Sequence, residues 1–303
     1  MEESKRTLSS DKPFALCRPP RFTLRRRRCP RPSGAPTQFQ EEIPQSNHIH
    51  KIMDPPRSIP EDMMNAYTLD GEIQVKHWYL NGTIDQNANI WSESRIQSFL
   101  DRFTFENIQA NTHGLEDYPN AAKFHMDACV KYIDHIKHKN IAVIGSIDPW
   151  IEAILVNAGA KSVTTVEWNV PVCNHAILRT ISYNEFVQST DVYDSIFSYS
   201  SIEHSGLGRY GDPLNPNGDI ETMEHIYNAL LPGGVCFVGF PVGKDTLVWN
   251  AHRIYGEKRL KLIYLDKFKE LEWIGLDKTY IFTCEHPGDY QPNGPTPLIV
   301  LQK

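Results

Sequence analysis

From residue 141 onward the sequence alternates short apolar stretches with segments of helical periodicity. Four stretches are typical of buried strands: IAVIG (141–145), SVTTVEW (162–168), YDSIFSYS (193–200) and VCFVGFPV (235–242). Two intervening segments are typical of helices: PWIEAILVNAGA (149–160) and DIETMEHIYNALLPGG (219–234). This alternation predicts an α/β domain over residues 141–303, with a parallel sheet and helices on both faces. In such sheets ligands bind beyond the carboxyl ends of the strands, at the switch point.

The 140 residues before this domain fall into two parts. Residues 1–60 are rich in Pro, Arg, Ser and Gln, which predicts a disordered tail because such a segment buries too little apolar surface. Residues 61–140 are predicted to be a helical extension that covers the domain, with Ser92 as an N-cap. Its helices are expected at SESRIQSFLDRF (92–103) and AAKFHMDACVKYIDHI (121–136).

The charge of the chain is unevenly distributed. Residues 1–40 carry ten Lys or Arg and three Asp or Glu, although the whole chain has a formal net charge of -6. The run RRRR (25–28) is either a nuclear address or nucleic-acid contact, or a solvated part of the tail. Since the net charge gives no general attraction to nucleic acid, we expect no nucleic-acid partner.

The cysteine spacing and apolar patterns indicate a cytoplasmic protein. The six cysteines form no CxxC pair, which is typical of reduced cysteines in a cytosolic protein. No apolar run approaches the ~20 residues that span a membrane, and the N-terminus lacks the apolar core of a signal peptide. His135 and His138 lack a carboxylate or cysteine partner at ligand spacing, so no metal site is predicted.

The connection after the first strand of the domain contains a single glycine. Gly145 permits a tight bend, while Asp148 is a favourable N-cap and Pro149 a favourable first helical residue. The N–H groups at this helix start could receive an anion, or the turn could be purely structural; the stretch is compatible with both.

Glu167 favours a nucleoside cofactor. It lies at the end of the second strand, twenty-two positions after Gly145, where an acid can accept hydrogen bonds from ribose hydroxyls. The alternative is an exposed acid at a strand end. A single glycine argues against NAD, whose pyrophosphate needs close backbone approach, whereas an adenosyl cofactor without phosphates needs less.

Polar residues follow the strand that begins at Tyr193. Ser200 and Ser201 follow its end, and His204 is a candidate general base because the pKa of histidine lies near neutrality; Glu203 is its partner or a base itself. Alternatively His204 orients the loop by hydrogen bonding. Further along, Arg209 either binds a substrate anion or pairs with Asp212.

This region and the one after it contain further candidate residues. Tyr210 beside Arg209 is a candidate substrate contact, and Asp219 is predicted to cap the next helix. A later cluster combines aromatic and hydrogen-bonding side chains, which suits an acceptor pocket or a surface helix: Trp249, Asn250, His252 and Arg253.

Three segments resemble domain-of-unknown-function family 268, whose core is similar to class I S-adenosylmethionine-dependent methyltransferases. They are VIGSIDPWIEAILVNAGAKSVTTVEWN (143–169), YSSIEHSGLGRYGDPLNPNGD (199–219) and LPGGVCFVGFPVGKD (231–245). The resemblance covers roughly residues 65–303. It implies a Rossmann-like seven-stranded sheet of order 3-2-1-4-5-7-6 with an antiparallel last strand. That strand would be LIVLQK (298–303), preceded by TYIFTCEH (279–286).

The resemblance also implies site residues. Gly145 and Ser146 would face the methionine part of S-adenosylmethionine, Glu167 its ribose, and the segment 200–204 would border the site of methyl transfer. The usual motif has an acid where this chain has Val143, and two further glycines that are replaced by Ile147 and Pro149. The sequence thus predicts a methyltransferase for a small-molecule or sugar-like acceptor. The alternative is a non-catalytic binding module that retains the fold.

Overall fold

The computed structural model describes residues 54–80, 90–116, 120–284 and 295–303. The tail up to residue 53, including the RRRR run, lies outside the described residues, and its disorder stays a prediction. Ile59 is buried beside Tyr67 and Ile73, so packing begins before residue 60. Among the described residues, none of the helices combines the length and apolarity needed to cross a membrane.

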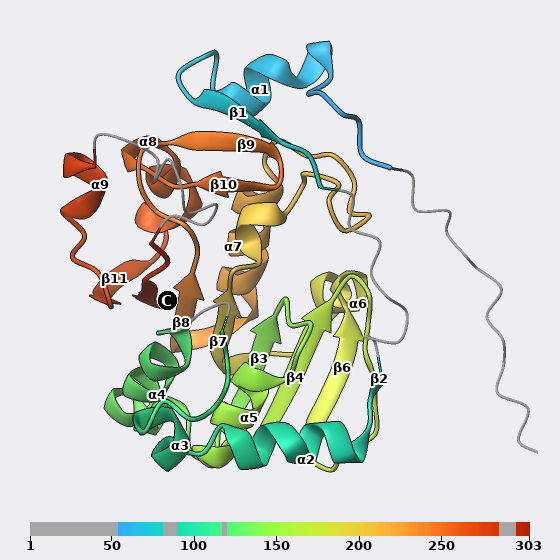
Figure 1. The fold of residues 1–303 in the computed structure, drawn as a ribbon, viewed down its shortest axis with the longest axis vertical. Helices are drawn as coiled ribbons and strands as arrows, with labels where there is room; N and C mark the ends of the chain where they lie inside the picture. The colour runs from blue at the N-terminus through green and yellow to red at the C-terminus, as the bar shows by residue number, and fades with distance from the viewer. Residues whose placement is uncertain (1–53, 81–89, 117–119, 285–294) are drawn as a thin grey trace, which may run out of the picture. The chain divides into compact units, whose positions relative to one another are not determined.

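A seven-stranded mixed sheet forms the centre of the fold (Figure 1). Its strands lie in the order β11 (Lys269–Ile274), β12 (Leu298–Gln302), β8 (Leu230–Gly239), β7 (Tyr193–Tyr199), β3 (Asn140–Ile144), β4 (Ser162–Glu167) and β6 (Leu178–Ser182). Strand β12 runs antiparallel to both of its neighbours, whereas the pairs among β8, β7, β3, β4 and β6 are parallel. Numbered in chain order, this is the predicted order 3-2-1-4-5-7-6, which identifies the class I methyltransferase fold.

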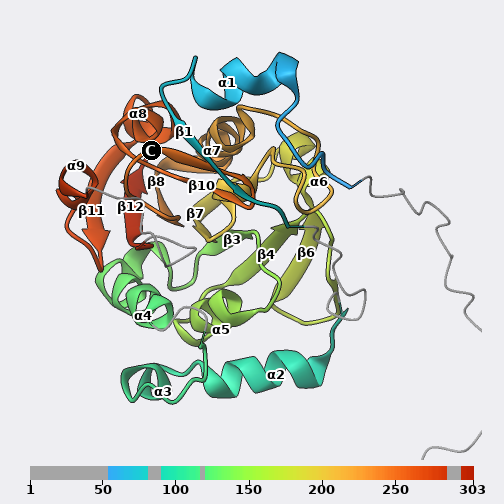
Figure 2. The ribbon, with the colours of Figure 1, turned by 45° about the horizontal axis from the view of Figure 1, so that its top comes forward.

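Alternation along β3 explains why helices cover both faces of the sheet. Successive side chains of a strand point to opposite faces. Ile141 and Val143 therefore enter one hydrophobic core, and Ala142 and Ile144 enter the other. The first core includes side chains of α2 (Glu93–Arg102), α4 (Ala121–Lys131) and α5 (Trp150–Asn157); the second includes those of α6 (Tyr183–Gln188) and α7 (Gly218–Ala229). Figure 2 shows these two groups of helices on opposite sides of the sheet.

The segment 61–140 contains strands as well as the predicted helices. Ser92 is the N-cap of α2, as predicted, and its side chain accepts from the Arg95 N–H. Strand β1 (Gln74–Trp78) pairs in parallel with β9 (Thr246–Asn250), which pairs with β10 (His252–Ile254). Strands β2 (Ile90–Trp91) and β5 (Val172–Cys173) form a separate pair. The other helical elements are η1 (Glu61–Met63), α1 (Met64–Thr68), α3 (Phe105–Gln109), η3 (Ile133–His135), η4 (Ile202–His204), α8 (Glu257–Leu260), η5 (Lys261–Leu265) and α9 (Tyr280–Thr283).

The strand expected at TYIFTCEH is wrong for its described part. Residues Tyr280–Thr283 form helix α9, and β11 supplies the strand before β12. The carboxylate of Asp277 accepts both the N–H and the hydroxyl of Thr279 at 2.8 Å. This interaction closes a turn at the point where a strand would need extended backbone, and the chain continues as a helix.

The prediction that Asp219 caps a helix is also wrong. Helix α7 starts at Gly218 with Asn217 in the N-cap position. The Asp219 carboxylate is instead fully buried and binds the Arg259 guanidinium and the Tyr255 hydroxyl. It is thus part of the packing between α7 and α8 rather than of the helix end.

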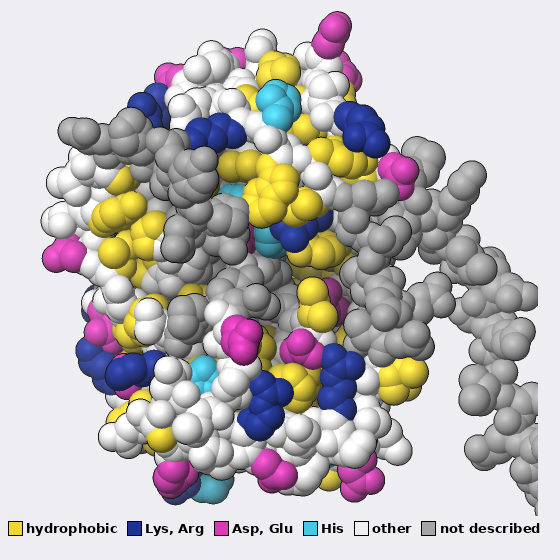
Figure 3. All heavy atoms as spheres, viewed as in Figure 1, with side chains coloured by type: hydrophobic (Ala, Val, Ile, Leu, Met, Phe, Trp, Pro, Cys, Tyr) yellow, Lys and Arg dark blue, Asp and Glu magenta, His cyan; other side chains and the backbone are white. Residues whose placement is uncertain are grey.

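The face shown in Figure 3 carries mixed charges. Basic and acidic side chains are interspersed over the helices in its lower half, and hydrophobic side chains gather above them near β10. On this face the charges are mixed rather than sorted by sign.

Candidate active-site cavity

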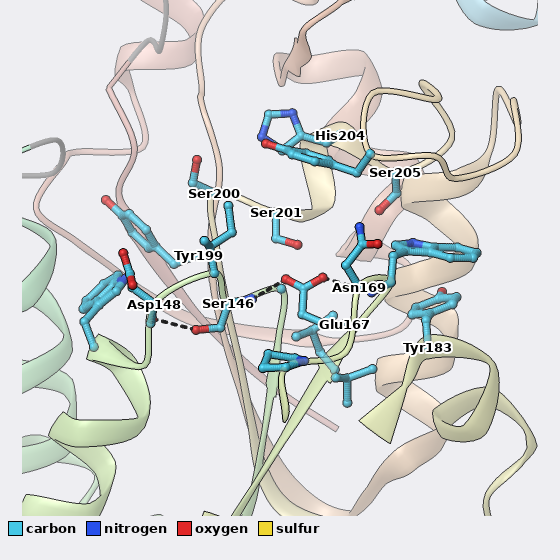
Figure 4. Close-up of a pocket in the computed structure, with 18 of the residues that line it drawn as sticks. Ser146, Asp148, Glu167, Asn169, Tyr183, Tyr199, Ser200, Ser201, His204 and Ser205 are labelled. Atoms are coloured by element: carbon cyan, nitrogen blue, oxygen red, sulfur yellow. Dashed lines mark hydrogen bonds between the residues drawn. The ribbon is translucent and has the colours of Figure 1, made fainter. Parts of the chain in front are cut away.

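A cavity of about 700 Å³ opens at the carboxyl ends of the central strands. Its walls include residues that directly follow β3, β4 and β7, together with Tyr183 at the start of α6. The chain leaves β3 towards β4 on one side, and β7 is its neighbour on the other, so the cavity lies at the switch point of the sheet. Figure 4 shows the side chains that converge on it.

The turn after β3 is held against the segment after β7. Gly145 has a φ of +76°, and a Cβ atom placed on it would lie 1.8 Å from Ser201 Oγ. Only glycine satisfies both the left-handed backbone and this close approach. The predicted cofactor residues Gly145, Ser146, Glu167, Ser200 and Ser201 all line the cavity.

Asp148 does not cap the following helix, contrary to the prediction. Helix α5 starts at Trp150, Pro149 occupies the N-cap position, and no side chain caps this end. The Asp148 carboxylate forms an ion pair with Arg95 of α2 instead. The Asp148 carboxylate therefore does not cap α5, although the Asp148 carbonyl accepts the Trp150 N–H at 2.8 Å.

The Glu167 carboxylate faces the cavity from the end of β4. Its Oε1 accepts the Ser146 N–H at 2.7 Å, and its Oε2 accepts the Trp168 N–H at 2.9 Å. Burial raises the pKa of Glu167, and these two bonds limit the rise. An ionised carboxylate has about four acceptor positions, so each oxygen keeps one for a ligand.

Asn169 is a cavity residue that the sequence reasoning missed. It lines the cavity beside Glu167, and its buried Nδ2 has no hydrogen-bond partner among the described residues. Figure 4 shows its side chain directed towards the same space as that of Glu167. The available signal was its spacing, because a second polar side chain two positions after a strand-end acid tends to point the same way.

Aromatic rings form part of the wall and were also missed. Trp168 stacks on Tyr183 with ring centroids 5.3 Å apart, and Trp150 meets Tyr199 edge to face at 5.9 Å. All four residues line the cavity. Trp168 follows β4, and the other three lie in α5, α6 and β7, so no local sequence pattern indicates that they meet.

The buried carboxyl of Glu152 stabilises the turn after β3. Glu152 of α5 accepts the Ser146 hydroxyl at 3.0 Å and the Thr165 hydroxyl at 2.7 Å. Burial raises the pKa of Glu152 to about 7. Glu152 thereby links α5, β4 and the turn after β3, where the usual motif has an acid on the strand itself.

The raised pKa predicts a pH-dependent effect of Glu152→Gln on stability. In the unfolded chain the pKa of Glu152 returns to about 4.3, so the folded state holds more protons between roughly pH 4 and 7. Wild-type stability therefore falls as the pH rises through this window, and the amide removes that loss. Urea unfolding should show a gain for Glu152→Gln, relative to wild type, that is about 3 kcal/mol larger at pH 8 than at pH 4. An equal difference at both pH values would contradict the assignment.

His204 faces the cavity in a defined tautomer. Its Nδ1 lies 2.6 Å from the Ala251 carbonyl oxygen, which can only accept, so Nδ1 carries the proton and Nε2 the lone pair. Burial, and then the charge of Arg209, lower the pKa of His204, so the ring is neutral at pH 7. Figure 4 shows His204 across the cavity from Glu167.

Glu203 is adjacent to His204 but does not line the cavity. Its Oε1 lies 3.8 Å from His204 Nε2, and its buried Oε2 has no hydrogen-bond partner among the described residues. Burial raises the pKa of Glu203 to about 7. Glu203 can therefore stabilise a charge on His204, but it does not touch a ligand in the cavity.

The candidate acceptor residues divide into two groups. Arg209 and Tyr210 line the cavity. The cluster assigned to an acceptor pocket or a surface helix lies in β9 and β10 instead, buried and outside the cavity: Trp249, Asn250, His252 and Arg253.

The buried members of β9 and β10 have structural roles. Trp249 donates to the Pro56 carbonyl, and Asn250 exchanges hydrogen bonds with the backbone of Leu80. Arg253 donates to the Ser205 carbonyl at 2.6 Å. These strands thus hold the N-terminal segment and the loop after β7 in place, and that loop supplies one wall of the cavity.

Comparisons with known proteins identify a family and several distant structures. The model of a family described as Caenorhabditis protein of unknown function, DUF268, matches residues 138–289, half of the chain. This range contains Gly145, Glu167 and His204. None of the curated proteins matches the sequence.

Solved structures with similar folds are distant in sequence. The N-methyltransferase NodS from Bradyrhizobium japonicum WM9, in complex with S-adenosylhomocysteine, is 12% identical, with 70% of this chain and 99% of that chain covered and a TM-score of 0.43. The 1,6-didemethyltoxoflavin-N1-methyltransferase of Burkholderia thailandensis is 11% identical, with 75% and 99% covered and a TM-score of 0.45. A Streptococcus mutans protein is 11% identical with a TM-score of 0.40; 62% of this chain is covered, and this chain spans about half of that protein, 49%.

Proposed function

Because this chain belongs to the DUF268 family of unknown function, we propose an activity from its own cavity: methyl transfer from S-adenosylmethionine to a small-molecule or sugar-like acceptor. The observation that carries the proposal is the Glu167 carboxylate, which faces the cavity with two acceptor positions unused. The strand order supports it, since this sheet places Glu167 and Gly145 side by side at the switch point.

The residues of the cavity fit S-adenosylmethionine. The two unused positions of Glu167 match the two hydroxyl donors of a ribose. The unpaired Nδ2 of Asn169 offers a donor next to them. Because this cofactor has no phosphates, Ile147 and Pro149 can stand where dinucleotide sites need glycine.

The remaining cofactor contacts would come from both sides of the switch point. Gly145 and Ser146 would approach the methionine part by their backbone, and Ser200 and Ser201 would close the site from the end of β7. When bound, S-adenosylmethionine supplies an electrophilic methyl group on its sulfonium. The protein must then hold the acceptor nucleophile in line and remove its proton.

His204 is the proposed base for that proton. Its Nε2 carries the lone pair because Nδ1–H is bound to the Ala251 carbonyl, and the ring is neutral at pH 7. A proton on Nε2 would favour the ionised form of Glu203 at 3.8 Å, so that the two groups would form an ion pair. Figure 4 shows His204 and Glu167 on different sides of the cavity, so an acceptor placed between them would lie between the base and the cofactor.

Calorimetric titration with S-adenosylmethionine tests the cofactor assignment. We expect saturable binding to the wild type and a loss of about tenfold or more in Glu167→Ala, because hydrogen bonds to a charged group contribute about 1.5–3 kcal/mol. Glu167→Gln preserves the size of the side chain and should also weaken binding. Asp191→Ala, an exposed acid outside the cavity, is the control and should bind like the wild type.

Two outcomes separate the proposal from its rivals. The absence of binding to the folded wild type at millimolar cofactor would overturn the cofactor assignment. Binding without transfer of a radiolabelled methyl group to any component of a small-molecule extract would favour the non-catalytic binding module. The replacement of the usual motif residues by Val143, Ile147 and Pro149 is the observation on which that second candidate rests.

A further inference from the structure

Arg209 brings a largely uncommitted guanidinium to the cavity wall. It stacks over the Tyr210 ring with 4.9 Å to the centroid, and its Nη1 donates to the Ala251 carbonyl at 3.0 Å. A guanidinium has five N–H donors, and this bond uses one. Its Nη1 also lies 3.3 Å from His204 Nδ1, which carries the proton and so cannot accept. Among the described residues, no other acceptor takes an Arg209 donor, and no ion pair within 4 Å includes Arg209.

The neighbouring carboxylates are committed elsewhere. Asp212 accepts backbone N–H groups of Gly206 at 2.7 Å and of Gly208 and Tyr210 at 3.3 Å, so it shapes its own loop rather than pairing with Arg209. Asp219 is occupied by two other arginines in the interior. The Glu203 carboxyl is within Coulombic range of Arg209 but forms no ion pair with it. Arg209 therefore presents a positive charge and a planar set of donors to the cavity without a carboxylate hydrogen-bond partner from the described residues.

The Ala251 carbonyl joins Arg209 to the proposed base. It accepts from both Arg209 Nη1 and His204 Nδ1, and these two nitrogen atoms lie 3.3 Å apart. A ligand group bound to the guanidinium would thus lie next to the His204 ring. Planar guanidinium donors match the two oxygens of a carboxylate or phosphate.

We propose that Arg209 anchors an anionic oxygen group, a carboxylate or a phosphate, on the acceptor and so places the neighbouring nucleophile at His204. That the anion belongs to a methyl acceptor rests on the proposed function. The anion site itself rests on Arg209 and its surroundings. It narrows the acceptor from a small or sugar-like molecule to an acid, such as a sugar acid or a sugar phosphate.

The charges around His204 agree with this arrangement. Arg209, Arg253 and the nearby His252 disfavour a positive charge on His204. The Glu203 carboxyl lies 3.8 Å from His204 Nε2. Arg253 lies 3.6 Å from Asp219 in the buried network, whereas Arg209 forms no ion pair with a carboxylate of the described residues. A bound anion would offset the charge of Arg209, so that the pKa of His204 rises and its basicity increases once the acceptor is in place.

The proposal is tested by an NMR titration of the histidine side chains, with the His204 signal assigned by its loss in His204→Gln. The probes are inorganic phosphate and acetate, added at constant ionic strength against sodium chloride. We expect one of them to shift the His204 signal saturably, and its identity gives the chemical class. In Arg209→Gln the apparent affinity should fall at least about tenfold. Arg179→Gln removes an arginine from an exposed pair outside the cavity and should titrate like the wild type.

The binding of S-adenosylhomocysteine to the same variants separates this proposal from the proposed function. Unchanged affinity in Arg209→Gln, with loss of the anion response, supports the acceptor site. A tenfold loss of S-adenosylhomocysteine affinity would instead assign Arg209 to the cofactor carboxylate and overturn the proposal. The absence of a saturable anion response in the wild type, or an equal response in Arg209→Gln, would also overturn it. If the wild type binds no S-adenosylhomocysteine but keeps an Arg209-dependent anion response, the proposed function fails and the anion site stands.

Discussion

Asp219→Ala is expected to lower the free energy of unfolding by about 3–5 kcal/mol, because it leaves buried guanidinium groups without a counter-charge. The Asp219 side chain is 0% exposed, and its partners Arg259 and Arg253 are 2% and 4% exposed. Arg259 holds it by two hydrogen bonds, and Arg253 Nε lies 3.6 Å away. Because both guanidinium groups are buried, water cannot solvate them once the carboxylate is removed.

The same substitution should loosen the cavity wall. Arg253 donates to the carbonyl of Ser205, and Arg259 donates to that of Pro216 at 2.6 Å. These carbonyls belong to the loop that follows η4 and contains Arg209. Ligand affinity in Asp219→Ala should therefore decrease together with stability, which distinguishes this network from an isolated buried ion pair.

Urea unfolding of Asp219→Ala and of a control from the same helix checks this prediction. Glu224 of α7 pairs with Lys267 at 2.8 Å, but the two side chains are 49% and 45% exposed. Exposed pairs contribute little to stability, so Glu224→Ala should unfold close to the wild type. Similar losses in both variants would contradict the proposed role of the buried network.

The pH dependence of this network has a definite sign. Burial by itself would raise the pKa of Asp219, but Arg253 and Arg259 together outweigh it, and the pKa lies below its ordinary value. The stabilisation is fully present above the unfolded-state pKa of about 4 and is lost as the pH falls towards the lower pKa of the folded state. Asp219→Ala should therefore unfold with a weaker acid dependence below about pH 4 than the wild type.

Much of the central sheet was predictable because its buried strands are continuous apolar runs. Strand β6 was missed: Leu178 and Ile181 are buried, but Arg179 is exposed at the edge of the sheet, and so the apolar run is broken. The pairing of β1 with β9 joins residues such as Gln74 and Thr246, which are more than 170 positions apart. No local periodicity indicates a partner at that distance.

The candidate site was predictable where a residue follows a strand directly. Gly145 and Glu167 were found in this way, because strand ends meet at one edge of a parallel sheet. His252 and Arg253 have the chemistry of site residues, yet the structure uses them inside a packed sheet. Residue type made both Arg209 and Arg253 candidates for substrate binding. Only the folded structure distinguishes them, because Arg209 lines the cavity and Arg253 is buried outside it. Asp148 likewise has the sequence position of a helix cap, but Arg95, fifty-three positions away, binds it instead.

Gly145→Ala should be the most damaging single substitution in the turn itself, with an expected loss of about 2–5 kcal/mol of stability. Two costs contribute. A residue with a side chain pays about 1–2 kcal/mol for the left-handed backbone, and forcing an atom into a packed site costs about 1–3 kcal/mol. The new Cβ would lie 1.8 Å from Ser201 Oγ and 2.4 Å from Ser201 Cβ, so the turn and the segment after β7 must separate.

Gly233→Ala isolates the first cost. Gly233 has the same φ of +76°, but a Cβ placed there would have no atom within 4 Å. We expect a loss of about 1–2 kcal/mol for Gly233→Ala, with unchanged affinity for S-adenosylmethionine. Equal losses of stability at the two glycines would show that the contact with Ser201 is unimportant.

The double variant Gly145→Ala/Ser201→Gly isolates the second cost. Removing the side chain of Ser201 leaves its Cα, at 3.7 Å, as the nearest atom of that residue, which is an ordinary contact distance. The double variant should therefore be more stable than Gly145→Ala alone and approach Gly233→Ala, with a coupling energy of about 1–3 kcal/mol. If the cavity binds S-adenosylmethionine through Gly145 and Glu167, cofactor affinity should fall tenfold or more in Gly145→Ala and recover in part in the double variant. Recovery of stability without any recovery of affinity would place the cofactor away from this turn.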